Sequence, residues 1–399
     1  MGRGLPALAV AAVLAVGVVC ATTSLQQDFA AYDAAGAARR AGLDPYVNQV
    51  DAQRRTKPGS ADARLWDGLA PFRHSRFLYP PLVADLFRPA AALPYLAAKT
   101  IFTVLLIAAW LGAAALVTGR RAVFVLASAL FFPLWRHLER GQIDLVLLLL
   151  LALAWRFRRQ AWPAGLAMGT AIAIKPALAG VAVIAAALGY VRAAGGAVAA
   201  LVLVAGLTIA VDGAPRLREY LTVVVPRASL YGEGGTAAML LEDPAEGDDG
   251  VSVRDGRAYR TALWDVPATA SLPRLLAPDS PTRLAAWLPF GLGFALLVGC
   301  ARRCAAVGGR AEWLFWGAAV ACVVTSPAGW VMGLVLALPL APALADTWAA
   351  ATWPRALSAA AAAGWIGVAL PWPVAGIATV GATLLVAVAA AAATRPVRA

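Results

Sequence analysis

Charged side chains are scarce in this sequence: Asp, Glu, Lys and Arg make up 14% of its 399 residues, whereas hydrophobic types make up 61%. Together with a mean hydropathy of +0.72, this excludes a soluble domain of ordinary composition. The two-residue alternation that is typical of barrel strands is also absent. Several apolar runs instead reach the roughly 18 to 20 residues that cross a bilayer as a helix. The sequence therefore predicts an all-α integral membrane protein.

Lysine, histidine and cysteine are scarce as well. Only three of the 34 basic residues are lysines, a bias that fits a GC-rich bacterial genome and from which we draw no chemistry. The four cysteines are scattered along the chain, at Cys20, Cys300, Cys304 and Cys322. Their spacing gives neither a disulfide framework nor a paired metal motif, so we expect structural thiols and no metal site.

The basic residues carry information about topology. In a soluble protein, a net charge of +12 would suggest nucleic acid as the partner. Here most of this charge lies in short loops between apolar runs, so we expect no nucleic-acid partner. Twelve apolar runs can be drawn, at residues 5–23, 95–118, 122–138, 143–157, 162–174, 177–191, 194–211, 284–300, 311–326, 329–347, 357–370 and 374–393. With twelve passes, the basic loops fall on one face, which the positive-inside rule makes cytoplasmic together with both termini. We expect a multi-pass protein of a bacterial cytoplasmic membrane, whose first run is an uncleaved signal anchor rather than a signal peptide.

Residues 162–191 leave the path of the chain open, because each half is shorter than a full span. One kinked helix would move every later basic loop outside, so charge parity favours two short passes or a re-entrant hairpin that turns near Lys175 and Pro176. A helix of about 13 residues rises only ~20 Å against a ~30 Å hydrocarbon core. Lys175 would then lie below the outer surface, in a position that needs a partner or water.

Two long polar stretches, residues 24–94 and 213–283, fall outside and contain most of the Asp and Glu residues. The charge and the Gly and Pro content of residues 242–250 predict a solvated, mobile loop. No internal repeat and no separate soluble domain is visible. We expect one polytopic membrane domain over residues 1–399, a bundle of about twelve helices, with an extracytoplasmic cap that carries short juxtamembrane helices.

The first polar stretch begins with charged residues at the membrane boundary. Asp28 lies a few residues beyond the first apolar run, so it should lie at the outer headgroup level. Small residues at positions 31, 34, 35 and 38 predict a short, closely packed helix with Tyr32 one turn from Asp28, and Gly42 and Pro45 end it. Downstream, FLYPPLVADLF contains Tyr79 and a Pro-Pro pair that cannot begin inside a helix. These features predict a pocket at the lipid boundary.

Further polar groups are expected at the outer ends of later apolar runs. They are Arg136, His137, Glu139, Arg140, Gln142, Asp144 and Lys175. Acids and cations that face one boundary suit a substrate that carries a phosphate and a hydroxyl to be deprotonated. Other interpretations stay open: Asp28 as a solvated acid after a helix, His137 as an interfacial histidine, and Asp144 as a favourable charge at a helix start. Lys175 is the hardest to explain without a function, because an ionisable group at that depth is costly.

Five segments, in order along the chain, carry a resemblance to a known family. They are DFAAYDAAGAARRAGLDPY, FLYPPLVADLFRPAAALPYLAAKTIF, GQIDLVLLLLLALAWRFRRQAWPAGLAMGTAIAIKPAL, EYLTVVVPRASLYG and SLPRLL. The ordered set resembles glycosyltransferase family 87, the polyprenyl-phosphate-mannose-dependent mannosyltransferases of the GT-C class. GQ with the following acid, the basic turn and the Lys-Pro pair form a more specific pattern than YPP.

The resemblance implies a reaction. Asp28 matches the acid that serves as the proposed general base of the family, and it would take a proton from an acceptor hydroxyl that attacks the anomeric carbon. The configuration at the anomeric carbon would be inverted. A β-linked polyprenyl-phosphate donor would give an α-linked product on a glycolipid or glycan of the cell envelope. Cations could replace a metal at the leaving phosphate, so no cofactor is expected. The expected substrate-binding residues are Tyr32, Tyr79, Arg136, His137, Arg140, Gln142, Asp144 and Lys175.

The sequence departs from the family pattern at two places. TSPAGWVMGLV has Met332 and Gly333 where a His pair would fall, and Asp144 replaces the usual amide after GQ. These changes leave the expected fold unchanged, but they leave open which donor the protein uses and whether it is active.

Two other functions stay open: a flippase or transporter for a lipid-linked sugar, and an inactive homologue that serves as an assembly partner. Polar groups that cluster outside and the absence of an inverted repeat argue against transport.

Overall fold

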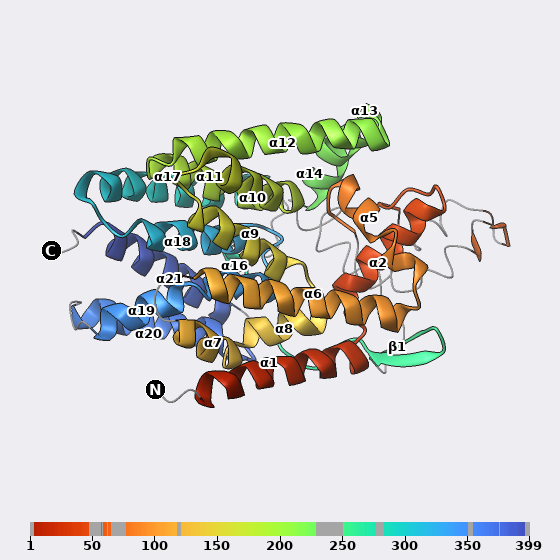
Figure 1. Ribbon diagram of the computed structural model, residues 1–399, viewed down its shortest axis with the longest axis horizontal. Coiled ribbons are helices and arrows are strands. Elements are labelled where there is room, and N and C mark those ends of the chain that lie inside the picture. Colours follow the sequence, from red (N-terminus) through yellow and green to blue (C-terminus); the bar gives the residue numbers. More distant parts are fainter. Residues whose placement is uncertain are drawn as a thin grey trace.

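The architecture is that of a helical bundle with a cap at one end, in a computed structural model. The structure describes residues 4–47, 57, 59–61, 63–64, 77–117, 121–228, 250–267, 269–276, 283–349, 354–374 and 376–395. Figure 1 shows most helices lying side by side along the long axis, with α2 (Gln27–Arg40), α5 (Pro81–Phe87) and the strands at one end. The described residues are mostly helical, as the sequence predicts.

Four helices within the described residues are long and apolar enough to cross a membrane. They are α1 (Gly4–Thr23), α6 (Tyr95–Leu116), α12 (Val191–Asp212) and α17 (Arg283–Val307). A helix of 20 residues rises ~30 Å, which is the thickness of a hydrocarbon core. Large apolar side chains stand exposed on their outer faces, among them Leu8, Val202 and Leu296, as suits contact with lipid. The structure agrees with the expected all-α membrane class.

The remaining apolar runs form shorter or broken helices. α7 (Arg121–Ala129) and α8 (Phe132–Arg140) make a pair bent by 66°, which counts as a fifth candidate span if the two are taken together. The run at 329–347 starts as the 3-10 helix η5 (Val331–Ala337) before α19 (Leu340–Ala349). The others are α9 (Asp144–Arg156), α10 (Ala161–Ile174), α11 (Ala179–Ala187), α18 (Ala311–Val324), α20 (Arg355–Ala369) and α21 (Ile377–Ala393). Helix length alone therefore does not establish the expected number of about twelve spans.

The helical conformation is interrupted between α10 and α11, as the sequence predicts. Lys175 has an extended backbone (φ −132°, ψ 91°), and Pro176 opens the 3-10 turn η3 (Pro176–Leu178). A residue before proline is disfavoured in the helical region, so α10 ends at Ile174. Because of this break, Lys175 lies at the end of a helix.

Small residues let α10 lie close against α12. A Cβ atom added at Gly165 would lie 2.4 Å from the backbone of Gly196, and one added at Gly169 would lie 2.7 Å from the carbonyl oxygen of Ala197. Any larger side chain at these positions would separate the helices. This contact fixes the helix that carries Lys175 at its end.

The short helix that the sequence predicts after the first apolar run is α2, and it packs against α5. Its small residues are buried: Ala31, Ala34, Ala35 and Ala38. A Cβ atom added at Gly36 would lie 2.6 Å from the carbonyl oxygen of Phe87, so the two helices are in backbone contact. α5 begins at Pro81, the second proline of the predicted pair, because proline is tolerated in a first turn.

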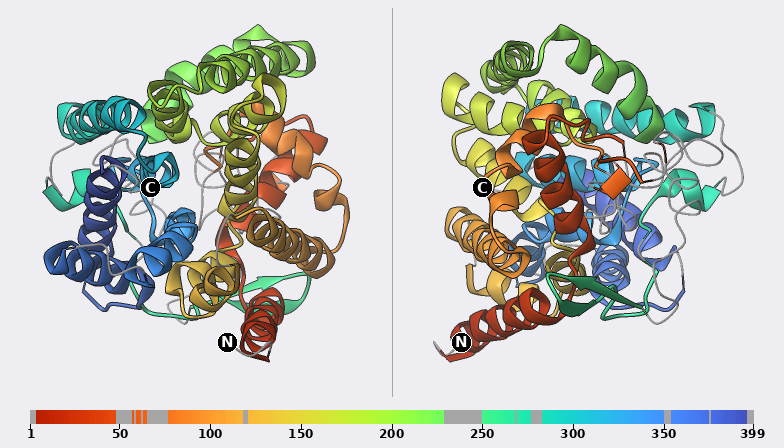
Figure 2. Two further views of the ribbon diagram at one scale, coloured as in Figure 1. Left: turned by 60° about the vertical axis from the view of Figure 1, so that its left-hand side comes forward. Right: turned by 90° about the vertical axis from the view of Figure 1, so that its right-hand side faces the viewer.

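A β-hairpin is the part of the fold that the all-helical expectation missed. β1 (Val251–Arg254) and β2 (Arg257–Arg260) pair antiparallel, and the turn residues Asp255 and Gly256 have φ values of 49° and 71°. Two positive φ angles fit a type I′ turn, for which Asp-Gly is a favoured sequence and hence the available signal. Figure 2 shows the hairpin beside the end of α1. There the Leu25 N–H donates to the Arg260 carbonyl oxygen at 2.8 Å. The predicted mobile loop lies outside the described residues, apart from Gly250.

Candidate active site

The turn between α1 and α2 is held by α8. Gln26 has a left-handed backbone with φ 54°, and its N–H donates to Ser24 Oγ at 3.1 Å. The Ser24 hydroxyl donates to the carbonyl oxygen of Glu139 at 2.8 Å. The Gln26 side-chain amide donates to the carbonyl oxygen of Leu138 at 2.9 Å. α2 then begins with Asp28 in its first turn, where the helix dipole favours a carboxylate.

Gly141 allows α8 to end directly against this turn. It has φ 63°, and a Cβ atom at this position would lie 2.9 Å from the Cβ atoms of both Gln26 and Phe29. Glycine adopts this backbone without a steric penalty and leaves room for the neighbouring chain. The glycine of the GQID segment therefore sets the distance between α8 and α2.

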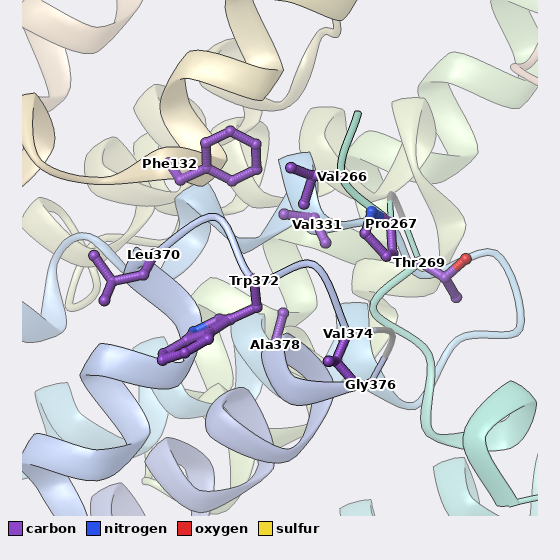
Figure 3. Close-up of a pocket in the computed structure, with 10 residues that line it drawn as sticks. All are labelled: Phe132, Val266, Pro267, Thr269, Val331, Leu370, Trp372, Val374, Gly376 and Ala378. Carbon is purple, nitrogen blue, oxygen red and sulfur yellow. The ribbon is translucent and has the colours of Figure 1, made fainter. Parts of the chain in front are cut away.

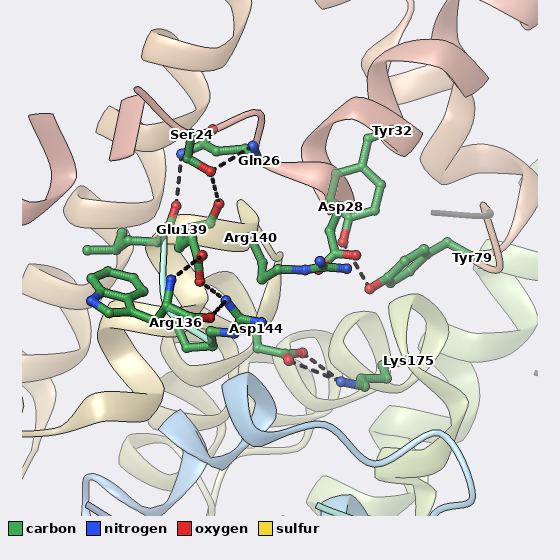
Figure 4. Close-up of polar contacts among 12 residues, drawn as sticks. Ser24, Gln26, Asp28, Tyr32, Tyr79, Arg136, Glu139, Arg140, Asp144 and Lys175 are labelled. Atoms are coloured by element: carbon green, nitrogen blue, oxygen red, sulfur yellow. Dashed lines mark hydrogen bonds and ion pairs between the residues drawn. The ribbon is translucent and has the colours of Figure 1, made fainter. Parts of the chain in front are cut away.

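Asp28 pairs with Arg140, the last residue of α8. Arg140 Nε donates to Asp28 Oδ2 at 3.4 Å, and the side chains are 17% and 13% exposed, respectively. Figure 4 shows Arg140 directed toward the Asp28 carboxylate. Residues that the sequence assigns only to the same boundary are thus in contact, and both remain partly open to a ligand.

Asp144 pairs with Lys175. Lys175 Nζ donates to both carboxylate oxygens, at 2.9 and 3.1 Å. Asp144 lies fully buried in the first turn of α9, whereas the Lys175 side chain is 21% exposed. A Cβ atom added at Gly333 would lie 3.3 Å from Asp144 Oδ2, so two of the positions that depart from the family pattern are neighbours. The small residue at 333 leaves space for the carboxylate at 144.

The charge of Arg136 is balanced by Glu139. The two residues form an ion pair one turn apart on α8, and the Arg136 side chain is only 8% exposed. The Glu139 carboxylate also accepts from the backbone N–H of Leu263 and, at 3.4 Å, from that of Trp264. Arg136 Nη1 donates to the Trp264 carbonyl oxygen at 3.3 Å. The pair ties α8 to the segment after β2. The sequence analysis gave Glu139 no individual role, although its i, i+3 spacing from Arg136 is a signal for an ion pair.

Two tyrosines lie next to the carboxylates. The Tyr32 hydroxyl donates to the Tyr79 hydroxyl at 2.9 Å, and the rings meet edge to face. Burial raises the pKa of both phenols well above the usual range, and the charges of Asp144 and Asp28 raise the pKa of Tyr79 further. Tyr79 is therefore neutral and within electrostatic reach of both carboxylates.

His137 and Gln142 are buried. His137 Nε2 accepts the backbone N–H of Leu145 at 3.1 Å, which satisfies a donor at the start of α9. His137 Nδ1 and Gln142 Oε1 are buried and have no hydrogen-bond partner among the described residues. Buried polar atoms are rarely left unpaired, so these two suit hydroxyl groups of a ligand.

Lys99 is a buried residue that the sequence analysis passed over. It lies fully buried on α6, where its ammonium group donates to the Ser24 carbonyl oxygen and lies 3.8 Å from the centroid of the Tyr259 ring. It thus joins the α1–α2 turn to the hairpin. A lysine inside an apolar run is costly, and this was the available signal.

Other features of the described residues offer less chemistry. No group of three or more His, Cys, Asp or Glu residues among them could hold a metal ion, and all four cysteines are free. A small recess beside α8 is lined by uncharged residues, among them Phe132, Val331 and Trp372 (Figure 3). None of the candidate residues lines this recess.

Comparisons with known proteins give a consistent assignment. The model of glycosyltransferase family 87 matches residues 77–326, which include the candidate residues from Tyr79 to Lys175 but neither Asp28 nor Tyr32. A protein of Mycobacterium tuberculosis is 36% identical over 162 residues; it is named a polyprenol-phosphate-mannose-dependent alpha-(1-2)-phosphatidylinositol mannoside mannosyltransferase. The match covers 34% of this chain and 38% of that protein. No solved structure matches this chain.

Proposed function

Because the chain belongs to glycosyltransferase family 87, we propose that it transfers mannose from a polyprenyl-phosphate donor to a glycolipid or glycan acceptor of the cell envelope. The name of the mycobacterial relative states a polyprenol-phosphate-mannose donor and a phosphatidylinositol mannoside acceptor, which supports this substrate class.

Asp28 is the proposed general base. Its carboxylate takes the proton of the acceptor hydroxyl while that oxygen bonds to the anomeric carbon and the bond from this carbon to the phosphate oxygen breaks. The configuration inverts, and polyprenyl phosphate leaves with the electron pair. The partial exposure of Asp28 at the start of α2 supports the role, since an acceptor can reach its carboxylate.

Arg140 links the base to the leaving group. Before transfer, the Asp28 carboxylate balances the charge of Arg140. Once Asp28 takes up the proton, that positive charge is free to stabilise the second negative charge that develops on the phosphate. Lys175, whose side chain is 21% exposed, is the second proposed phosphate contact. Arg136, which is bound to Glu139 and Trp264, supports α8 in this proposal.

The sugar is proposed to bind between the charged pairs and the tyrosines. His137 Nδ1, as a donor, and Gln142 Oε1, as an acceptor, have no partner within the described part of the chain, so sugar hydroxyls can satisfy them. Tyr79 lies near both Asp28 and Asp144 and is held by Tyr32. Its neutral hydroxyl can donate to the substrate.

We assign the reaction to the outer face of a bacterial cytoplasmic membrane, with about twelve passes, both termini in the cytoplasm and one domain over residues 1–399. The basic loops between apolar runs support this orientation, since Lys and Arg are enriched in cytoplasmic loops. In this assignment, short helices such as α10 and α11 count as passes, although each alone is shorter than the hydrocarbon core is thick.

The observation that carries the proposal is that two ion pairs, Arg140 with Asp28 and Lys175 with Asp144, place their carboxylates within electrostatic reach of Tyr79 (Figure 4). The test supplies the purified full chain in nanodiscs with polyprenyl-phosphate mannose and glycolipid acceptors. We expect transfer by the wild type and a loss of about 10² to 10⁴-fold in Asp28→Asn, the range for a positioned base. Asp33→Asn, a buried acid on the same helix, is the matched control and should retain transfer.

The same assay separates the alternatives. In sealed vesicles, transfer that occurs only with donor in the outer leaflet supports the enzyme. Movement of intact donor across the bilayer without transfer would identify a flippase. A wild-type chain that transfers from no polyprenyl-phosphate sugar would support an inactive homologue and end the proposal.

A further inference from the structure

The six charged groups of the candidate site are balanced in pairs. The pairs are Arg140 with Asp28, Arg136 with Glu139, and Lys175 with Asp144. Three cations meet three carboxylates, so these groups together present no net positive charge. An incoming anion therefore meets ion pairs at this site.

Lys175 and Arg140 are the cations of this set that a ligand can reach. Their side chains are 21% and 17% exposed, whereas that of Arg136 is 8% exposed and bound to Glu139. A phosphate group that enters the site contacts Lys175 from its open side. Asp144 is then its nearest fixed negative charge.

Asp144 cannot move away to make room. Its side chain has no exposed area, and both of its oxygens accept from Lys175. The backbone of Gly333 lies beside the carboxylate, since a Cβ atom added there would lie 3.3 Å from Oδ2. Asp144 lies in the first turn of α9, near the positive end of the helix dipole. The negative charge at 144 thus remains beside Lys175 when a ligand binds.

We propose that Asp144 determines which phosphate charge the site accepts: it admits a lipid carried on one phosphate with a single negative charge and disfavours lipid diphosphates. Each additional negative charge of a diphosphate would be repelled by Asp144 and Asp28 and would meet no additional cation of this set. The repulsion is strong because the groups are largely shielded from water. This inference rests on the proposed function, since it takes Lys175 as a phosphate contact.

The test compares two non-transferable lipids on the full chain in nanodiscs: farnesyl methyl phosphate, with one negative charge, and farnesyl diphosphate. We expect the wild type to bind the methyl phosphate more tightly. In Asp144→Asn the affinity for the diphosphate should rise about tenfold, and that for the methyl phosphate by less than about threefold. Asp144→Glu, which keeps the charge, should retain the wild-type ratio. So should Asp33→Asn, which removes a buried acid paired with Arg254.

Two results would overturn the inference: a wild type that prefers the diphosphate, or a folded Asp144→Asn variant with an unchanged ratio. The wild-type preference is measured without any variant, so it tests the inference even if Asp144→Asn fails to fold. Lys175→Met should weaken both lipids, and unchanged binding there would count against the phosphate contact and this inference together. A changed ratio in Asp144→Asn without sugar transfer from any donor would support the role of Asp144 and contradict the proposed function alone.

Discussion

At the scale of single residues, the site consists of charges paired across long stretches of chain. Asp28 and Arg140 are 112 residues apart in sequence, and Asp144 and Lys175 are 31 apart. Removal of one partner leaves the other as an uncompensated, partly buried charge, which costs more than the ion pair itself contributes. Substitutions of single residues at these pairs therefore change both binding and catalysis.

Arg140→Met should lower kcat for sugar transfer by about 10² to 10³-fold, the range for removal of one group that stabilises developing charge. The reason is that Arg140 no longer stabilises the leaving phosphate once Asp28 is protonated. Steady-state kinetics in nanodiscs measures the effect. Arg88→Met is the control, because Arg88 is half exposed and pairs only loosely with Asp85, at 3.6 Å. Equal kcat values in the two variants would contradict the role of Arg140.

Asp33 predicts a dependence of stability on pH. Burial raises its pKa from the usual 3.8 to about 6, although the charge of Arg254 lowers it, so the folded protein binds a proton more tightly than the unfolded chain. The free energy of unfolding should therefore fall as the pH rises from about 4 to about 6, by ~3 kcal/mol.

Asp33→Asn should remove this fall, so that the variant is more stable than the wild type at pH 7 and similar to it at pH 4. Thermal unfolding of the two proteins across this pH range measures the difference. Parallel stability curves would mean that the pKa of Asp33 is not raised.

At the scale of elements, one assembly positions Asp28: the end of α8, the α1–α2 turn and the hairpin. Ser24 lies at its centre, with its hydroxyl bound to α8 and its carbonyl oxygen bound to Lys99 of α6. Tyr259 of β2 covers Lys99, and the Leu25 N–H donates to the carbonyl oxygen of Arg260 of β2 at 2.8 Å. The second polar stretch thus folds onto the first and holds the start of α2.

Gly141→Ala should destabilise this assembly. The left-handed backbone costs an alanine about 1–2 kcal/mol, and its Cβ atom would collide with Gln26 and Phe29. We expect a lower Tm and a larger loss of transfer activity than the loss of stability explains, because α2 moves with Asp28. Gly195→Ala, on α12 with no atom within 4 Å of the added Cβ, should be neutral or stabilising. Equal Tm values in the two variants would contradict the close contact.

Tyr259→Ala should loosen the hairpin, whereas Tyr259→Phe should retain it. The ring contact with Lys99 needs an aromatic face but no hydroxyl, and such contacts contribute up to about 2 kcal/mol when shielded from water. Hydrogen exchange of residues 251–260 measures the difference. If alanine and phenylalanine gave the same exchange rates, the contact with Lys99 would not hold the hairpin.

At the scale of the whole molecule, a bundle of helices carries α2, α5 and the hairpin at one end (Figure 1). The candidate residues Asp28, Arg140 and Asp144 lie at the start of α2, the end of α8 and the start of α9. Exposed apolar side chains on α1, α12 and α17 suit lipid, while ion pairs tie the cap to the bundle. Arg216 of α13 (Ala214–Glu219), just after α12, pairs with Asp44 at 3.0 Å beyond the end of α2. The cap is thus anchored at several helices.

The proposed orientation predicts a labelling pattern. In a chain with its four native cysteines replaced, a cysteine at Asp255 in the hairpin turn should react with an impermeant thiol reagent on intact cells. A cysteine at Arg303, on the exposed surface near the end of α17, should react only after permeabilisation. Reaction at position 303 in intact cells would overturn the assignment of that end to the cytoplasm.

The sequence by itself determined the helical class, the short helix α2, its end near Gly42 and the break at Lys175. These features depend on local hydrophobicity, on proline and on glycine, which act over a few residues. The charged candidates were also visible, because ionisable groups beside apolar runs are costly wherever the chain leads. Their position near the outer membrane boundary could be inferred in this way. The residues with which they pair could not.

Only the tertiary structure decided which charge meets which. Arg136 is bound to Glu139, Lys175 to Asp144 and Arg140 to Asp28, because α8, α9 and the break after α10 converge on the start of α2. The contact between Lys99 and the hairpin residue Tyr259 was hidden for the same reason. An ion pair or a cation–aromatic contact depends on distances of a few ångströms between segments, and no pattern along one chain contains those distances.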